Sequence, residues 1–203
     1  MLCGPIILAI SRTVEIRDPY TAGHQRRAAH LAATLAQKLK LPEERIEGIF
    51  LGALIHDIGK IAVPSEILSR PGPLMDEDIK YLQIHCRKGY EILEPVNFPW
   101  PVAEIALQHH EHLDGSGYPQ GLRGGEILFE ARIICVADVV ESLTAYRPYR
   151  PARSIEEALA AITTRADKWY DSRIVDACSG LFEKGYHIDT IDMDELTWLS
   201  SLS

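Results

Sequence analysis

Apolar residues recur with helical spacing along most of this chain. The clearest stretch follows i, i+3, i+4, i+7 spacing through Ile46, Ile49, Phe50 and Ala53, in a helix that we expect to begin at Pro42 and to stop near Gly59. The same period predicts helices over residues 6–17, 24–39, 76–93, 102–109, 126–143 and 171–182, and another from Ser154. The apolar run 133–137 could also be a strand, but no other stretch offers it a β-rich partner. The pattern therefore predicts an all-α fold, a single compact helical bundle.

Several polar residues fall on the apolar faces of these helices. Asp57 continues the stripe that starts at Ile46, and an unpaired carboxylate buried there would cost several kcal/mol. A lone His-Asp pair favours a structural explanation, but other histidines and a second aspartate recur in phase with apolar residues. The full set is His24, His56, Asp57, His85, His109, His110 and Asp138. Five imidazoles and two carboxylates make the ligand set of a two-metal centre, in which the two oxygens of Asp57 can bridge both ions.

The donor types narrow the choice of metal. Imidazole with carboxylate suits Fe and Mn, with Zn, Co and Ni as alternatives, better than Mg or Ca, which prefer oxygen ligands only. Cys86, next to His85, is an additional soft donor that the sequence leaves open. Two divalent ions would leave the site with net positive charge, which suits a phosphodiester substrate and a bridging hydroxide as the nucleophile.

Composition restricts the other functions. The chain has 203 residues, and we expect one domain over residues 1–203 that belongs to, or was cut from, a longer regulatory protein. A formal net charge of −8 argues against binding a nucleic-acid polymer. The four cysteines are far apart, which is typical of reduced thiols in the cytoplasm. The apolar run 6–10 is too short for a membrane segment.

The motifs, taken in order, resemble the HD-GYP domains, metal-dependent phosphodiesterases of cyclic di-GMP within the HD phosphohydrolase superfamily. The resemblance runs from about Arg17 to about Ile174. It includes residues 17–24 (RDPYTAGH), 56–60 (HDIGK), 109–111 (HHE), 114–119 (DGSGYP), 137–138 (AD) and 147–150 (RPYR). It implies an HD-type bundle with a Gly-rich GYP loop and hydrolysis of cyclic di-GMP to linear pGpG, with GMP as a further product left open.

The resemblance also implies roles for individual residues. The seven residues above map onto the metal ligands, with Asp57 and Lys60 as the catalytic pair. The substrate contacts are expected at Asp18, Lys60, Gly117, Tyr118, Arg147 and Arg150. Tyr20 stands where some members have a glutamate that helps to bind a third metal, so we expect two ions and arrest at the linear dinucleotide.

Two functional alternatives stay open. The substrate could be another cyclic dinucleotide or a nucleotide, and the chain could be a catalytically idle module that binds cyclic di-GMP or, through the GYP loop, a GGDEF domain. A di-iron oxygenase is disfavoured by Lys60 and by the arginines of residues 147–150, which favour a phosphate substrate.

Three residues near the motifs are harder to place. Glu111 is expected to orient an imidazole, whereas His30 and His112 are expected to be structural or exposed.

Overall fold

Helices form the secondary structure of this protein wherever the computed structural model describes the chain, over residues 3–18, 23–70, 72–145 and 151–188. Their bounds are α1 (Cys3–Arg17), α2 (His24–Lys38), α3 (Glu43–Ile55), η2 (Ile58–Ala62), α4 (Ser65–Leu68), α5 (Asp76–Leu93), α6 (Val102–Gln108), η3 (Gly124–Glu126), α7 (Phe129–Thr144), α8 (Ile155–Thr163) and α9 (Ser172–Phe182). Apart from two isolated bridges, these residues contain no β-structure. The all-α prediction is confirmed.

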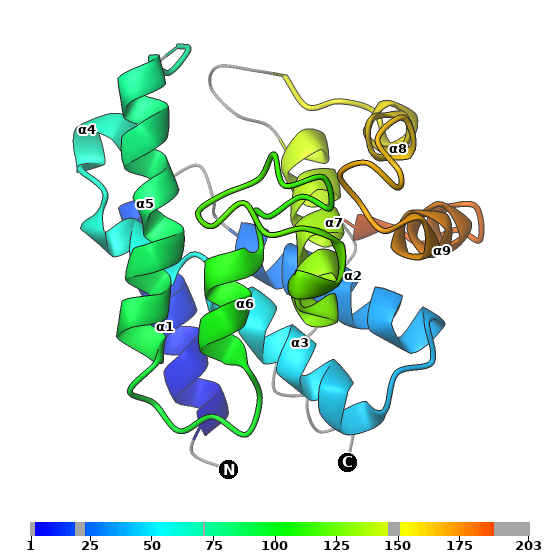
Figure 1. Cartoon of the computed structure of the whole chain (residues 1–203), viewed down its shortest axis with the longest axis horizontal. Coiled ribbons are helices and arrows are strands. Elements are labelled where there is room, and N and C mark those ends of the chain that lie inside the picture. Colours follow the sequence, from blue (N-terminus) through cyan, green and yellow to red (C-terminus); the bar gives the residue numbers. More distant parts are fainter. Residues whose placement is uncertain (1–2, 19–22, 71, 146–150, 189–203) are drawn as a thin grey trace.

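Helix α3 lies in the middle of the bundle. From Gly48 to Ile55 every one of its residues is buried, because the helix is apolar on all sides. It packs against α1, α2, α6 and α7. Figure 1 shows α5, α6 and α7 standing next to one another, with α8 and α9 beyond α7. Helices from both halves of the sequence therefore meet at α3.

The predicted helix bounds hold in several places. Helix α5 spans the predicted residues, with Asp76, Glu77 and Asp78 in its first turn, where acids favour the positive end of the helix dipole. Ser154 caps α8 by accepting a hydrogen bond from the backbone N–H of Glu157. Three bounds were wrong: α1 starts at Cys3 instead of Ile6, α3 ends at Ile55 instead of near Gly59, and α7 starts at Phe129, after the 3₁₀ turn η3, instead of at Glu126.

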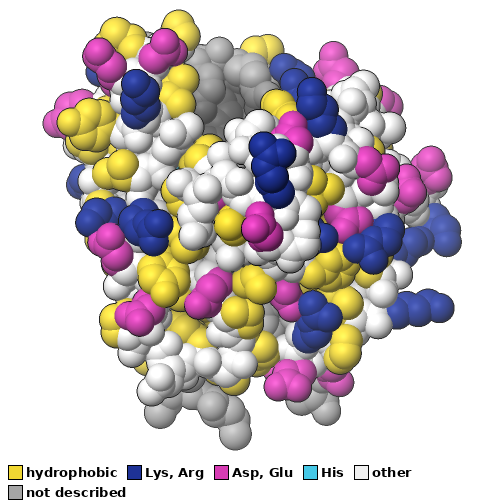
Figure 2. Space-filling model, viewed as in Figure 1, with side chains coloured by type: hydrophobic (Ala, Val, Ile, Leu, Met, Phe, Trp, Pro, Cys, Tyr) yellow, Lys and Arg dark blue, Asp and Glu magenta, His cyan; other side chains and the backbone are white. Residues whose placement is uncertain are grey.

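Buried cysteines and a mixed surface complete the fold. Cys86, Cys135 and Cys178 are buried free thiols. None of the helices in the described residues is long and apolar enough to cross a membrane. On the face in Figure 2, basic and acidic side chains are interspersed, and no histidine side chain is seen. Four of the eight histidines are buried in the interior, namely His24, His56, His85 and His109.

Candidate metal centre

The seven predicted ligands meet in one place. His24 starts α2, His56 caps the end of α3 and Asp57 follows it. His109 caps the end of α6 and is followed by His110, while His85 and Asp138 lie within α5 and α7. All except His110 are buried, with exposed fractions of 8% or less, and His110 is partly buried. Five helices therefore each contribute at least one donor.

Asp57 stands at the centre of this set. Its Oδ2 lies 3.6 Å from Nε2 of His56 and 4.0 Å from Nε2 of His24. Its Oδ1 lies 3.3 Å from Nε2 of His85 and 4.0 Å from Nε2 of His109. The two oxygens of one carboxylate thus face two different groups of imidazoles, which is the arrangement that a bridging ligand requires.

Each group has the composition of a cation site. In the first, which we call the His24 group, the donor atoms of His24, His56 and Asp138 lie within 4.8 Å of one another. Nε2 of His24 is 3.1 Å from Oδ1 of Asp138. The second, the His85 group, consists of His85, Cys86, His109 and His110, again within 4.8 Å.

Hydrogen bonds hold four of the imidazoles in a single orientation. Nδ1 of His56, His85 and His109 lies 2.6, 2.6 and 2.9 Å from the backbone carbonyl three residues earlier, at Ala53, Leu82 and Ala106. Nδ1 of His24 contacts Glu141 instead. Because Nδ1–H donates in each case, Nε2 is the nitrogen directed at the cluster, where it can bind a metal ion.

The two groups differ in charge before any ion binds. Burial lowers the pKa of His85 and His109, and lowers that of His110 to about 3, so these imidazoles are neutral at pH 7. Burial would also lower the pKa of His24, but the carboxylates of Glu141 and Asp138 outweigh it and raise that pKa to about 9. A neutral imidazole needs no deprotonation before it binds a cation, whereas His24 must first lose its proton.

A cationic side chain already lies beside the bridging carboxylate. Nζ of Lys60 is 2.6 Å from Oδ2 of Asp57 and 3.3 Å from Oδ2 of Asp18. Burial would raise the pKa of Asp57, but Lys60 and the surrounding histidines hold it well below its usual range. The carboxylates thus create a negative potential that attracts cations. The imidazole and carboxylate donors beside Lys60 are of the types that bind a transition-metal ion.

Comparison with known proteins places the chain in a family. A family model described as HD domain matches residues 9–174. The chain belongs to the HD domain family. A curated relative of this HD domain is the cyclic di-GMP phosphodiesterase response regulator RpfG of Xanthomonas campestris, 42% identical over 170 residues, which cover 83% of this chain and 45% of the relative.

Two further comparisons agree with this assignment. The 3′3′-cGAMP-specific phosphodiesterase 3 of Vibrio cholerae is 39% identical over 155 residues, which cover 76% of this HD domain and 34% of that protein. The crystal structure of the cyclic GMP-AMP phosphodiesterase V-cGAP3 from V. cholerae has the same fold, with a TM-score of 0.72 at 18% identity, over 97% of this chain and 52% of that one. The chain thus spans less than half the length of these curated relatives, and the HD-type bundle is confirmed.

Glu141 is a site residue that the sequence did not reveal. It is 1% exposed and contacts Nδ1 of His24. Arg27 holds it from the other side, with Nε 2.7 Å from Oε1 of Glu141. Glu141 is three residues after Asp138 on the same face of α7, so its position within an apolar helix was an available signal.

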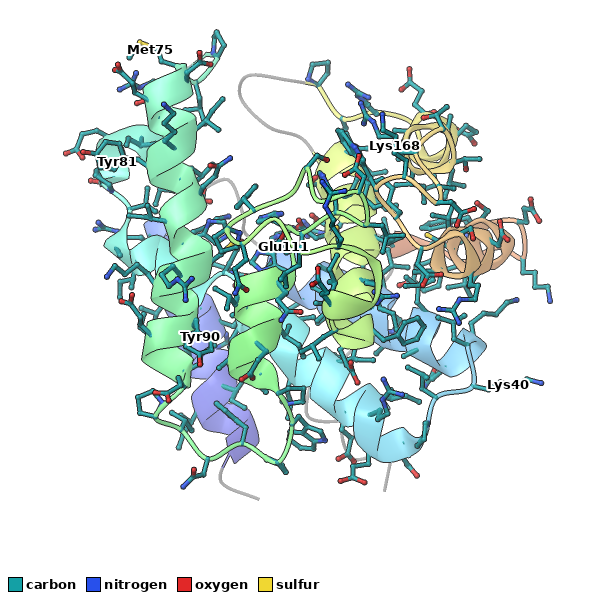
Figure 3. The ribbon with its side chains drawn as sticks, in the orientation of Figure 1. Lys40, Met75, Tyr81, Tyr90, Glu111 and Lys168 are labelled. Atoms are coloured by element: carbon teal, nitrogen blue, oxygen red, sulfur yellow. The ribbon has the colours of Figure 1, made fainter. Side chains whose placement is uncertain are left out.

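Glu111 has another role than expected. Its carboxylate accepts hydrogen bonds from the backbone N–H groups of Gln120, Gly121 and Leu122, at 2.6, 3.2 and 2.9 Å. Figure 3 shows Glu111 above the end of α6, where the chain enters the loop over residues 113–125. Glu111 therefore fixes the GYP loop, and the prediction that it orients an imidazole was wrong.

The loop approaches the ligands closely. A Cβ on Gly117 would lie 2.4 Å from the backbone N of His112 and 2.5 Å from the carbonyl oxygen of His110, so only glycine fits. The next residue, Tyr118, packs its ring against His110 with centroids 4.8 Å apart. Gly117 permits the approach, and Tyr118 forms a wall of the His85 group.

Other predicted residues have mixed outcomes. Asp18 is buried and pairs with Lys60. Nδ1 of His30 lies 2.8 Å from the hydroxyl of Tyr186, which confirms a structural histidine. His112 is half-buried and stacks on Trp169 instead of standing free. Tyr20, Arg147 and Arg150 lie outside the described residues.

Proposed function

We propose that this HD domain is a metal-dependent phosphodiesterase that binds two divalent transition-metal ions and hydrolyses cyclic di-GMP to linear pGpG. The observation that carries the proposal is the placement of Asp57, whose two oxygens face two separate groups of donors. The names of relatives support the substrate class, because RpfG and the V. cholerae protein are both phosphodiesterases of cyclic dinucleotides.

The residues divide the chemical work. Divalent ions, when bound, activate water and stabilise the charge that develops on phosphorus. Asp57 directs one carboxylate oxygen toward each group of donors, and the Nδ1 hydrogen bonds hold the imidazoles in their orientation. Lys60, held by Asp18, supplies a positive charge next to the site for a phosphate oxygen. Asp18 thus acts by positioning Lys60.

The roles of Arg147 and Arg150 in substrate binding are assigned by the family resemblance. Arg147 and Arg150 would clamp the phosphate, since a guanidinium can make two parallel hydrogen bonds to it. We expect Arg147→Ala to raise KM for cyclic di-GMP with little loss of metal, because the clamp acts on the substrate alone. Unchanged kinetics with this variant would remove Arg147 from the site.

The proposal also includes a protein partner, a cellular compartment and the identity of the ions. Pro119 and Gln120 in the GYP loop are exposed and would be the contact for a GGDEF domain. The buried free thiols support a reducing compartment such as the cytoplasm. Fe and Mn are the first candidates for the ions, because imidazole and carboxylate dominate the donors.

A nucleotide panel tests the proposal. The purified chain, loaded with Mn²⁺ or Fe²⁺, is incubated with cyclic di-GMP, 3′3′-cGAMP and cyclic di-AMP, and the products are followed by chromatography. We expect pGpG to accumulate first, with GMP at least about tenfold slower, a barrier difference of about 1.4 kcal/mol. GMP without a pGpG intermediate would contradict the arrest at pGpG.

Other results would favour the alternatives. Preference for 3′3′-cGAMP would favour the function in the name of the second relative. No turnover by metal-loaded protein would favour the idle module. Asp57→Ala is the control: it should lose both ions and all activity while the helical far-ultraviolet signal survives. Retention of two ions by that variant would contradict the bridging role.

A further inference from the structure

The His85 group contains a donor of a different kind. Cys86 follows His85 in α5, and its side chain is fully buried. Its Sγ lies 3.5 Å from Nε2 of His85 and within 4.8 Å of the donor nitrogens of His109 and His110. The thiol thus faces the same space as three imidazoles.

The distances fit a cation shared by Cys86 and the imidazoles, with Oδ1 of Asp57 as a further ligand. At near-tetrahedral angles between neighbouring ligands, Zn–N bonds of about 2.0–2.1 Å and a Zn–S bond of about 2.3 Å place two nitrogens about 3.3 Å apart, and a nitrogen and a sulfur about 3.5 Å apart. Nε2 of His85 is 3.3 Å from Nε2 of His109, and 3.5 Å from Sγ of Cys86. Both separations agree with ligands of one ion.

We propose that Cys86 is a thiolate ligand of the ion in the His85 group, and that it makes this half of the site prefer zinc to manganese. The inference rests on the proposed metal centre and specifies its chemistry. On binding, the S–H bond breaks, an S–metal bond forms and the proton passes to solvent. A soft sulfur donor favours Zn²⁺ over the harder Mn²⁺. The His24 group offers only nitrogen and oxygen, so the two halves would differ in selectivity.

The other described cysteines provide a contrast. Sγ of Cys135, also buried, lies 4.0 Å from the carbonyl oxygen of Glu111 and belongs to neither donor group. Cys178 packs in the hydrophobic core. Cys135→Ala is therefore a matched control, since it removes a buried thiol near the site but no donor.

Cobalt substitution tests the assignment without an activity assay. The metal-free protein is titrated with Co²⁺, and the near-ultraviolet band of thiolate-to-cobalt charge transfer is recorded together with the cobalt content. We expect the band in the parent protein and in Cys135→Ala, and its loss in Cys86→Ala and Cys86→Ser. In competition between Zn²⁺ and Mn²⁺, the Cys86 variants should also bind a smaller share of zinc.

The outcomes separate this inference from the proposed function. Two bound cobalt ions without a thiolate band in the parent protein would overturn the role of Cys86 and leave the metal centre standing. Failure to bind cobalt would overturn both. If the Cys86 variants do not fold, X-ray absorption of the zinc-loaded parent protein decides: a sulfur neighbour at about 2.3 Å supports the proposal, and nitrogen and oxygen neighbours alone overturn it.

Discussion

At the scale of single residues, the site depends on hydrogen bonds that fix imidazoles before an ion arrives. His56, His85 and His109 each use the backbone carbonyl three residues earlier, a partner that the preceding turn of the same helix supplies. His24 is at the start of α2, and its Nδ1 contacts Glu141 of α7 instead. The orientation of His24 therefore depends on a side chain that is distant in the sequence.

This dependence predicts the effect of changing Glu141. Glu141→Gln removes the charge that Arg27 and His24 share, and we expect metal affinity to fall by about 10–100-fold, as for other partners of ligating histidines. Isothermal titration with Mn²⁺ measures it. Glu130→Gln is the control, because Glu130 also lies in α7 and pairs with Arg45 outside the site. Equal affinities for the two variants would contradict the positioning role.

The pKa of His24 predicts how the stability of the metal-free protein depends on pH. The pKa is about 9 in the folded protein against 6.5 for the free group, so the folded state binds more protons between these values. This stabilising contribution is fully present below about pH 6.5 and is lost as the pH rises through about 9. Urea midpoints across this range measure it. The same slope in His24→Gln would assign the effect to another group.

At the scale of elements, a close approach between η2 and α5 places His85 beside Asp57. A Cβ on Gly59 would lie 1.9 Å from the carbonyl oxygen of His85 and 2.4 Å from the backbone N of Gly89. Backbone atoms cannot yield as a flexible side chain can. The chain leaves the α3 helix before Gly59 and passes directly against α5, which is consistent with the early end of α3.

We therefore expect Gly59→Ala to separate η2 from α5. The cost is about 1–3 kcal/mol of unfolding free energy or more, together with lower metal affinity. Thermal unfolding and metal titration measure both effects. Gly125→Ala is the matched control: a Cβ there meets nothing within 4 Å, and its stability should change by no more than about 0.5 kcal/mol. A stable, metal-binding Gly59→Ala protein would show that the approach is not required.

At the scale of the whole molecule, the metal centre joins elements from most of the chain. α2, α3, α5, α6 and α7 each contribute a donor. An ion that binds only the folded arrangement stabilises all of them together. The single domain over residues 1–203 stays a prediction.

This linkage predicts that Mn²⁺ raises the Tm of the metal-free protein. At about 100 times the Kd, each site adds about 2.7 kcal/mol to the unfolding free energy. Differential scanning fluorimetry across a Mn²⁺ titration measures the rise. Asp57→Ala should show little of it, because both sites lose a ligand. A full rise in that variant would mean that the ions bind elsewhere.

The sequence by itself determined the features that depend on local periodicity. Helical spacing predicted the helices and showed which histidines and aspartates fall on buried faces, because a helix repeats within a few residues. The motif order was sufficient to indicate the family. The resemblance was confirmed by the match over residues 9–174.

Only the tertiary structure decided how the donors are grouped. Which oxygen of Asp57 faces which imidazoles depends on the packing of helices that are far apart in the sequence. The same holds for the contact between Glu141 and His24, which are 117 residues apart. Glu111 was misassigned for this reason: it directly follows the predicted ligands His109 and His110, but its carboxylate turns to the returning loop. Periodicity places a side chain on a face of its helix, and only packing determines what that face meets.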